Sequence, residues 1–213
     1  MCQMTPLLSE KQLDIIRSWL GTGSINIFGL PFAGKDTHGN ELVSIFNAPA
    51  LIGGGDIMRN STISAEAKRI IDAGGLSPSD EYMRTVTPYL QSEAFAGKPL
   101  ILSSVGRWIG EEQGVLKATE ASGHPTRAVI YLNIDEATLF KRWEVSQTLG
   151  DRGDRADDAE HALRTRINEF NEKTLPVIEV YRSMDLLIEV NSDADRQEIL
   201  ETILSRLLQL ATV

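Results

Sequence analysis

A glycine-bearing segment near the front of the chain carries residues suited to binding phosphate. It reads NIFGLPFAGKDTHG over residues 26–39, and four residues separate Gly29 from Gly34 and Lys35, which is the spacing of a Walker A phosphate loop. Such glycines let backbone N–H groups surround a phosphate, while the lysine adds a full positive charge toward the β- and γ-phosphates. The motif predicts nucleotide contacts for Gly29, Pro31, Phe32, Ala33, Gly34, Lys35, Asp36 and Thr37. It does not by itself indicate which reaction follows.

Asp36 is the unusual member of this segment, since many phosphate loops carry a magnesium-binding Ser or Thr directly after the lysine. A carboxylate beside a bound triphosphate repels it unless a cation lies between them. One interpretation is that Asp36 helps to hold Mg²⁺. The other is that Asp36 faces solvent and complements the positive N-terminus of the following helix. The residues alone leave both interpretations open.

The elements that must hold this loop follow from an alternation of apolar and helical patterns. Short apolar runs lie at 25–28, 50–52, 100–102, 128–132 and 186–190, and longer helical patterns lie at 64–73, 79–95, 136–147, 157–181 and 193–210. Strands that alternate with helices predict an α/β fold in which helices cover a parallel sheet. A further helix is expected over 9–20, where Ser9 and Gln12 have the spacing of a capping box. The polar stretch 146–154 is expected to be a mobile loop.

Length, charge and composition exclude several classes of protein. The 213 residues suit one domain with small inserts, preceded by a helical extension at 1–24. The formal net charge of −9 argues against binding along a nucleic acid, and no run approaches the ~20 apolar residues of a membrane span. Cys2 is the single cysteine, and His38, His124 and His161 show no metal-binding pattern and are expected at the surface. We expect a cytoplasmic monomer whose partners are small-molecule nucleotides, with no nucleic acid and no membrane.

The motifs that follow the phosphate loop resemble those of the adenylate kinases, a family of nucleoside monophosphate kinases. That family reads GxPGxGKGT, TGDLLR and DGFPR, then an arginine, a lid and RxDD before a long helix. Here GLPFAGKDT, GGDIMR, SSVGR, Arg142 and GDRADD stand in the same order, over residues 25 to about 205. The resemblance implies a three-layer P-loop NTPase fold with a five-stranded parallel sheet. It also implies a kinase domain at 25–213, with a small monophosphate-binding insert near 53–83 and a short lid near 143–156.

The resemblance further implies an acceptor site for a nucleoside monophosphate. Its residues would be Gly54, Gly55, Asp56, Arg59, Leu76, Ser77 and Arg107, with the two arginines binding the acceptor phosphate. Gly54 stands in place of a base-contacting threonine of the family, and Glu111 stands in place of its adenine-reading glutamine. Gln113 could read the base only if the turn before it is longer than in the family. These changes leave the choice between AMP and another monophosphate open.

On the opposite side of the site, arginines would close over the phosphates. By resemblance Arg142 stacks on the ATP adenine, Arg155 and Arg166 contact the transferred or acceptor phosphates, and Arg152 substitutes for a further family arginine. Positive charge of this kind stabilises a phosphoryl group as it moves. Arg164 is expected instead to pair with Glu160 on a helix surface. Because this connection is short and holds no cysteine, a zinc-binding lid is not expected.

The family carboxylate that helps to hold magnesium is missing from its usual place, where this chain has Ser103. We hypothesise that Asp36 supplies that carboxylate from the phosphate loop. The implied reaction is reversible transfer of the γ-phosphoryl group of Mg-ATP to AMP, giving two ADP, with catalytic residues Lys35, Arg107, Arg155 and Arg166. The alternatives are a kinase for another nucleoside or deoxynucleoside monophosphate, and a nucleotide-binding module without transfer activity.

Overall fold

A parallel sheet of five strands forms the centre of the molecule. The computed structural model describes residues 8–149 and 160–212. The strands stand in the order β2-β3-β1-β4-β5 and comprise Ser24–Gly29 (β1), Leu51–Gly53 (β2), Leu100–Ser103 (β3), Thr126–Asn133 (β4) and Leu187–Asn191 (β5). The five-stranded parallel sheet expected from the sequence is thereby confirmed.

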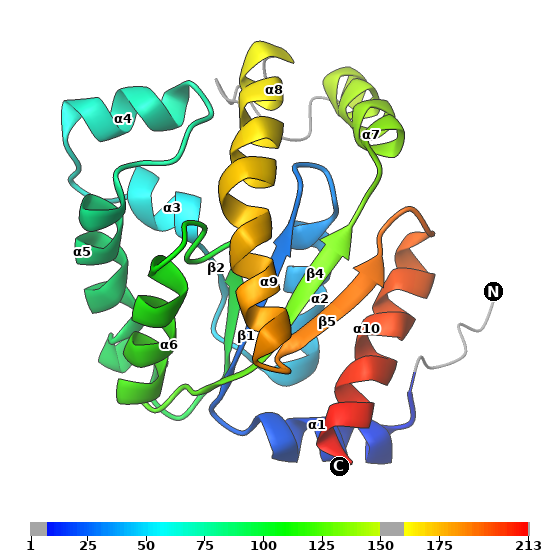
Figure 1. Ribbon diagram of the computed structural model, residues 1–213. Coiled ribbons are helices and arrows are strands. Elements are labelled where there is room, and N and C mark those ends of the chain that lie inside the picture. Colours follow the sequence, from blue (N-terminus) through cyan, green and yellow to red (C-terminus); the bar gives the residue numbers. More distant parts are fainter. Residues whose placement is uncertain (1–7, 150–159, 213) are drawn as a thin grey trace.

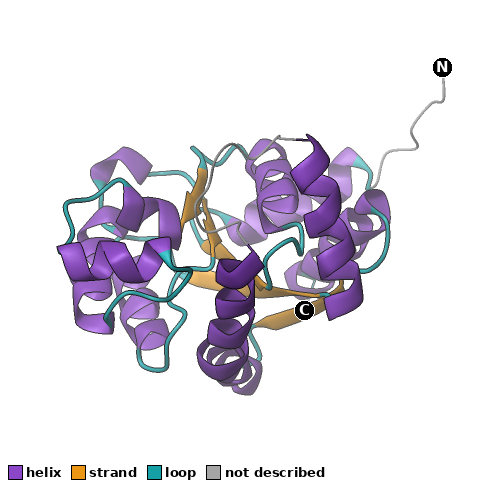
Figure 2. Ribbon diagram, turned by 90° about the horizontal axis from the view of Figure 1, so that it is seen from above, coloured by secondary structure: helices purple, strands orange, loops and turns teal. Residues whose placement is uncertain are grey.

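Helices cover both sides of this sheet. They comprise Glu10–Leu20 (α1), Lys35–Phe46 (α2), Gly54–Arg59 (α3), Ala65–Asp72 (α4), Ser79–Leu90 (α5), Glu111–Ala121 (α6), Glu136–Leu149 (α7), Glu160–Glu169 (α8), Leu175–Ser183 (α9) and Arg196–Ala211 (α10). Figure 1 shows α6 and α9 in front of the sheet and α2 behind it, and Figure 2 shows from above that the sheet runs between helices. The three-layer α/β fold is therefore confirmed. No helix in the two described ranges is long and apolar enough to cross a membrane.

Strand β1 lies at the centre of the sheet because it pairs on both sides. Ile25 is in register with Ile101 of β3 and with Ala128 of β4. All residues of β1 are buried, which explains why it reads as a nearly continuous apolar run. Asn26 is the exception in that run, and its side chain donates to the carbonyl of Val105 at 2.7 Å and accepts from the Val105 amide at 3.3 Å. This central strand thus holds the start of the loop that follows β3.

Helix α1 begins with the predicted capping box. The Gln12 amide donates to the Ser9 hydroxyl at 3.4 Å, and the Ser9 amide donates to the Gln12 side chain at 3.0 Å. Ile16 and Leu20 are buried in the main hydrophobic core, and α1 packs against α10. Helix α1 therefore shares the hydrophobic core of the sheet.

The structure corrects several boundaries expected from the sequence. The helical pattern at 79–95 forms an α-helix only as far as Leu90, and a 3₁₀ turn follows at Glu93–Phe95. Pro88, two residues before the end of the α-helix, has no N–H to donate. Helix α6 was not predicted, because its apolar pattern is weak and its first turn contains two buried glutamates. Helix α7 continues to Leu149, so the prediction of a loop is wrong for 146–149. Residues 150–154 of that prediction lie outside the described residues.

Two of the histidines expected at the surface are buried instead. His38 and His124 are each only 2% exposed. The Nδ1 atom of His38 lies 2.8 Å from the Glu41 carboxylate, and that of His124 lies 2.8 Å from the Thr22 carbonyl. Because each ring has a hydrogen-bond partner, burial costs it little. His161 is exposed, as expected.

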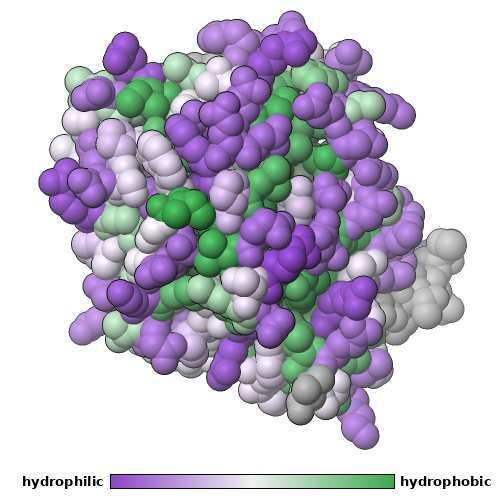
Figure 3. Space-filling view, viewed as in Figure 1, coloured by the Kyte–Doolittle hydropathy of each residue, from purple (hydrophilic) through white to green (hydrophobic). Residues whose placement is uncertain are grey.

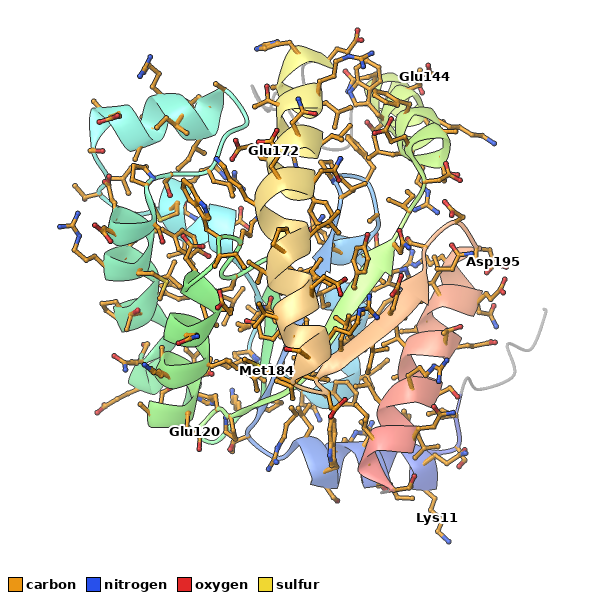
Figure 4. All side chains as sticks on the ribbon, in the orientation of Figure 1. Lys11, Glu120, Glu144, Glu172, Met184 and Asp195 are labelled. Carbon is orange, nitrogen blue, oxygen red and sulfur yellow. The ribbon has the colours of Figure 1, made fainter. Side chains whose placement is uncertain are left out.

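Polar side chains dominate the outside of the described part of the chain. Lys11, Glu120, Glu144 and Asp195, labelled in Figure 4, project from four different helical regions at the periphery. Asp195 also caps α10, because its carboxylate accepts hydrogen bonds from the backbone amides of Gln197 and Glu198 at 2.9 and 3.0 Å. The large apolar side chains that are exposed lie on separate segments, namely Tyr89, Ile109, Val145 and Met184. Figure 3 shows apolar side chains between hydrophilic ones across one face.

Candidate active site

A cavity of about 450 Å³ opens at the carboxyl ends of β1, β2 and β3, the edge at which open α/β sheets bind ligands. Gly29, Gly53 and Ser103 end these strands and line it. Its lining includes these residues predicted for nucleotide binding: Gly29, Pro31, Phe32, Gly34, Lys35, Asp36, Thr37, Gly54, Gly55, Asp56, Arg59, Leu76, Ser77, Arg107 and Arg166. The fold therefore brings the predicted phosphate loop and the predicted acceptor residues to one cavity.

The loop between β1 and α2 has the backbone of a phosphate cradle. Gly34 adopts a left-handed conformation with φ 88°, and its position before α2 leaves the first N–H groups of that helix without a side-chain cap. Gly29 has no room for a side chain, since a Cβ there would lie 2.8 Å from the Leu132 carbonyl oxygen. The Nζ of Lys35 donates to the carbonyls of Gly29 and Leu30 at 2.8 and 2.7 Å. These bonds hold the ammonium group beside the cradle.

Two residues predicted to contact ATP, Ala33 and Arg142, do not line the cavity. The Ala33 side chain is buried in the main core, while its carbonyl accepts a hydrogen bond from the Ser192 hydroxyl at 2.6 Å. Arg142 donates to the carbonyls of Phe32 and Ser192 at 3.2 and 2.7 Å. The observed role of Arg142 is to brace the phosphate loop against the residues that follow β5. Its stacking on adenine stays a prediction.

Helix α3 carries Arg59, the first of the two predicted acceptor arginines. The helix begins at Gly54, directly after β2, and ends with Arg59. The Arg59 guanidinium donates to the Asp56 carboxylate at 2.7 Å, one turn earlier on the helix. Both side chains are more than a third exposed, and exposed pairs of this kind contribute little stability. A phosphate can therefore replace Asp56 as the partner of this guanidinium at a small cost in free energy.

Arg107 lies in the loop between β3 and α6 and approaches the π-helical turn Phe170–Thr174, which joins α8 to α9. Its Nε donates to the Thr174 hydroxyl at 3.4 Å. Burial lowers the pKa of Arg107 to about 10, and the positive charge of Arg166 contributes to the same shift. Arg107 is still protonated at neutral pH. A bound phosphate would supply negative charge beside these two arginines.

Glu111, rather than Gln113, reaches the cavity from the start of α6. Its carboxylate accepts hydrogen bonds from the backbone amides of Arg107 and Trp108 at 2.8 and 3.0 Å, which shapes the arginine-bearing loop. Burial raises the pKa of Glu111. Gln113 is exposed, because two further residues on a helix turn a side chain by about 200° around the axis. Gln113 does not line the cavity, so the structure does not support the prediction that it reads the base.

Only part of the predicted lid lies in the described residues. Arg166 of α8 lines the cavity, and Ser146 of α7 does so as well. Arg164 pairs with Glu160 at 2.9 Å, as predicted for a surface arginine. Arg152 and Arg155 lie outside the described residues, so their contacts with phosphate stay predictions.

The residues beside the phosphate loop are compatible with Mg²⁺. Asp36 and Thr37 are exposed and line the cavity together. Within residues 8–149 and 160–212, no group of three or more histidine, cysteine, aspartate or glutamate side chains is placed to enclose a metal ion. Mg²⁺ does not need such a group, since it is commonly held by one or two carboxylates, water and substrate phosphates. Asp36 fits that pattern.

Sequence reasoning missed several residues that shape the site. Tyr82 of α5 lines the cavity together with Met58 and Ile71. The sequence places Tyr82 and Ile71 only within helical patterns, and Met58 only within the GGDIMR motif. Asn26 holds the loop that carries Arg107, and a signal existed for it, namely one amide side chain inside an apolar run. Nothing in the local sequence indicates that Tyr82 reaches the cavity.

Comparison with known proteins agrees with the motifs. Residues 27–186 match the family model described as adenylate kinase. Among curated proteins, the chain is 31% identical over 192 residues to an adenylate kinase of Agrobacterium fabrum, covering 86% of this chain and 96% of that protein. It is 33% identical over 175 residues to an adenylate kinase of Rhizobium meliloti, covering 78% of this chain and 90% of that one. A similar protein from a Nocardioides species is 31% identical over 179 residues, covering 81% and 91%.

Proposed function

This chain belongs to the adenylate kinase family and is a nucleoside monophosphate kinase, and we propose that it transfers the γ-phosphoryl group of ATP to AMP, giving two ADP. The observation that carries the proposal is that one cavity is lined both by the phosphate loop with Lys35 and by the arginines Arg59, Arg107 and Arg166. One cavity of this kind can hold a donor triphosphate and an acceptor phosphate end to end. Such an arrangement suits phosphoryl transfer, which depends on positioning and on charge stabilisation.

Each cation has a proposed role in this reaction. Lys35 exchanges its hydrogen bonds to the carbonyls of Gly29 and Leu30 for contacts with the transferring phosphoryl group. In the transition state the negative charge of that group is spread over its three equatorial oxygens, which the ammonium group stabilises. Arg59 and Arg107 hold the acceptor phosphate, and Arg107 is already oriented by Glu111 and Thr174. Arg166 lies close enough to Arg107 for their charges to interact and bridges the two phosphates. Each of these interactions stabilises the transition state more than the separate substrates.

The metal and the lid complete the proposal. Asp36 and Thr37 would hold Mg²⁺, which when bound neutralises charge on the phosphates of ATP. Asp36 would thus replace the carboxylate that the family carries at the position of Ser103. Arg152 and Arg155, in a short lid near 143–156, would close over the phosphates and exclude water, which otherwise competes as acceptor. An acceptor-binding insert near 53–83 and a monomeric state belong to the same proposal.

An ATP-dependent assay over AMP, GMP, CMP, UMP and dTMP, with and without Mg²⁺, tests this function. We expect diphosphate formation that requires Mg²⁺ and is fastest with AMP. Lys35→Ala serves as the control, since it should abolish turnover while the protein still folds. A faster reaction with another monophosphate would identify that monophosphate, instead of AMP, as the acceptor. Nucleotide binding without turnover on any monophosphate would indicate a binding module and would contradict the proposal.

A further inference from the structure

The lining of the acceptor half of the cavity includes two chemically different kinds of side chain. The guanidinium groups of Arg59 and Arg107 suit a phosphate. The apolar side chains are those of Met58, Ile71 and Leu76. An aromatic base is stabilised by contact with apolar side chains, so the base of a bound monophosphate would lie against them. Polar groups there would decide which base fits.

Tyr82 lines the same cavity and places its hydroxyl in the space that a side chain of residue 54 would otherwise occupy. A Cβ built on Gly54 would lie 2.5 Å from the Tyr82 hydroxyl oxygen and 2.7 Å from the Ser104 carbonyl oxygen. Real Cβ atoms do not approach other atoms so closely, so the glycine and the tyrosine hydroxyl require each other. The hydroxyl therefore comes from α5 and lies against the first residue of α3.

The hydrogen bonding of Tyr82 leaves it able to donate. Its oxygen accepts from the Gly106 amide at 3.0 Å, and this is the one hydrogen bond that the described residues give it. The hydroxyl proton is thus not used within that part of the chain. Burial raises the pKa of Tyr82, so the proton is retained at neutral pH.

The surroundings of Tyr82 hold its hydroxyl in a fixed position. The residue is 7% exposed and belongs to a hydrophobic cluster with Val86 of its own helix and Met58 of α3. Glu111 lies near enough for its charge to affect Tyr82, and it lines the same cavity. The site therefore offers a fixed hydroxyl donor together with a carboxylate acceptor. A purine with an amino group beside a ring nitrogen presents the complementary acceptor and donor.

We propose that Tyr82 is a specificity-determining residue of the acceptor site, and that its hydroxyl donates a hydrogen bond to a ring nitrogen of the purine base, beside an amino group that faces Glu111. The inference rests on the proposed function, because it needs a nucleoside monophosphate in this half of the cavity. It assigns base recognition to a residue far in sequence from both the phosphate loop and Arg59.

Tyr82→Phe removes the hydroxyl and keeps the ring, so it is the variant to test. Wild type and variant are compared with AMP and with analogues that lack one ring nitrogen, 1-deaza-AMP and 7-deaza-AMP. We expect kcat/KM for AMP to fall about tenfold in the variant, as for one lost hydrogen bond, with the KM for ATP unchanged. One analogue should lower kcat/KM of the wild type by a similar factor and cause no further loss in the variant. Tyr89→Phe, on the same helix but 44% exposed and not lining the cavity, should behave as wild type.

Three results would overturn the inference. Tyr82→Phe could use AMP as well as the wild type does. It could lose equally with AMP and both analogues, which would show that the hydroxyl acts only by supporting Gly106. Wild-type protein could use both analogues as well as AMP, an outcome that decides the matter even if the variant does not fold. Failure of the proposed function looks different, because the wild type would then phosphorylate another monophosphate faster than AMP, or no monophosphate at all.

Discussion

Asn26→Leu should destabilise the protein and loosen the acceptor site together. The side chain of Asn26 is 1% exposed and satisfies both the N–H and the C=O of Val105, which is itself fully buried. Leucine has a similar size but can satisfy neither group. Each buried group left without a partner costs about 1–3 kcal/mol, so we expect a loss of about 3 kcal/mol in the free energy of unfolding. For a chain of this size that corresponds to a melting temperature lower by about 6–12 °C.

The functional part of this prediction follows from where Val105 lies. It stands two residues before Arg107, so a displaced Val105 moves the guanidinium away from the acceptor phosphate. We expect the KM for AMP to rise about tenfold, equivalent to one weakened charge-assisted hydrogen bond, and the KM for ATP to stay the same. Urea unfolding measures the first effect, and initial rates with each substrate varied in turn measure the second.

Ser24→Ala is the matched control for Asn26→Leu. Ser24 is buried in the same strand and donates to the His124 carbonyl at 3.1 Å, away from the loop of Arg107. Its removal should reduce stability and leave both KM values unchanged. The reasoning would be refuted if Asn26→Leu lost less than about 1 kcal/mol, or if its KM for ATP rose as much as its KM for AMP.

Two further variants test other parts of the site, and a third tests how stability depends on pH. Arg107→Gln should raise the KM for AMP about 10–100-fold, because charge-assisted hydrogen bonds are lost, and an unchanged KM would remove Arg107 from the acceptor site. Asp36→Asn should raise the Mg²⁺ concentration needed for half-maximal rate about tenfold, and an unaltered magnesium dependence would leave Asp36 with only a helix-terminal role. Burial lowers the pKa of His38 from 6.5, so below that value the unfolded chain binds more protons than the native protein and stability falls as the pH falls. His38→Asn should reduce this loss between about pH 7 and about pH 5 in urea unfolding, and an equal loss in both proteins would contradict it.

The sequence alone determined the architecture and the position of the phosphate loop that is proposed to bind the donor nucleotide. Strand and helix patterns carry information in residues that are close together, and the β1 run, the glycines at 29 and 34 and Lys35 lie within a dozen residues. A phosphate loop needs only this local spacing, because its own backbone N–H groups form the cradle. The family motifs then identified all three arginines that line the cavity in the described residues, namely Arg59, Arg107 and Arg166. Local pattern failed at α6, where buried charges replace an apolar face.

Tertiary structure decided which residues complete the acceptor end. The Tyr82 hydroxyl lies against Gly54, and the Arg107 guanidinium donates to the Thr174 hydroxyl. Glu111 lines the cavity, whereas Gln113 does not. None of these contacts follows from spacing along the chain. The partners come from different elements, so their approach depends on how α5, α6 and the turn after α8 pack at the carboxyl ends of the strands. A one-residue rotation on a helix turns a side chain by about 100°, which is enough to move it from cavity to solvent. Packing fixes that rotation, and for this reason the residues of the proposed base-recognition site could be identified only in the folded molecule.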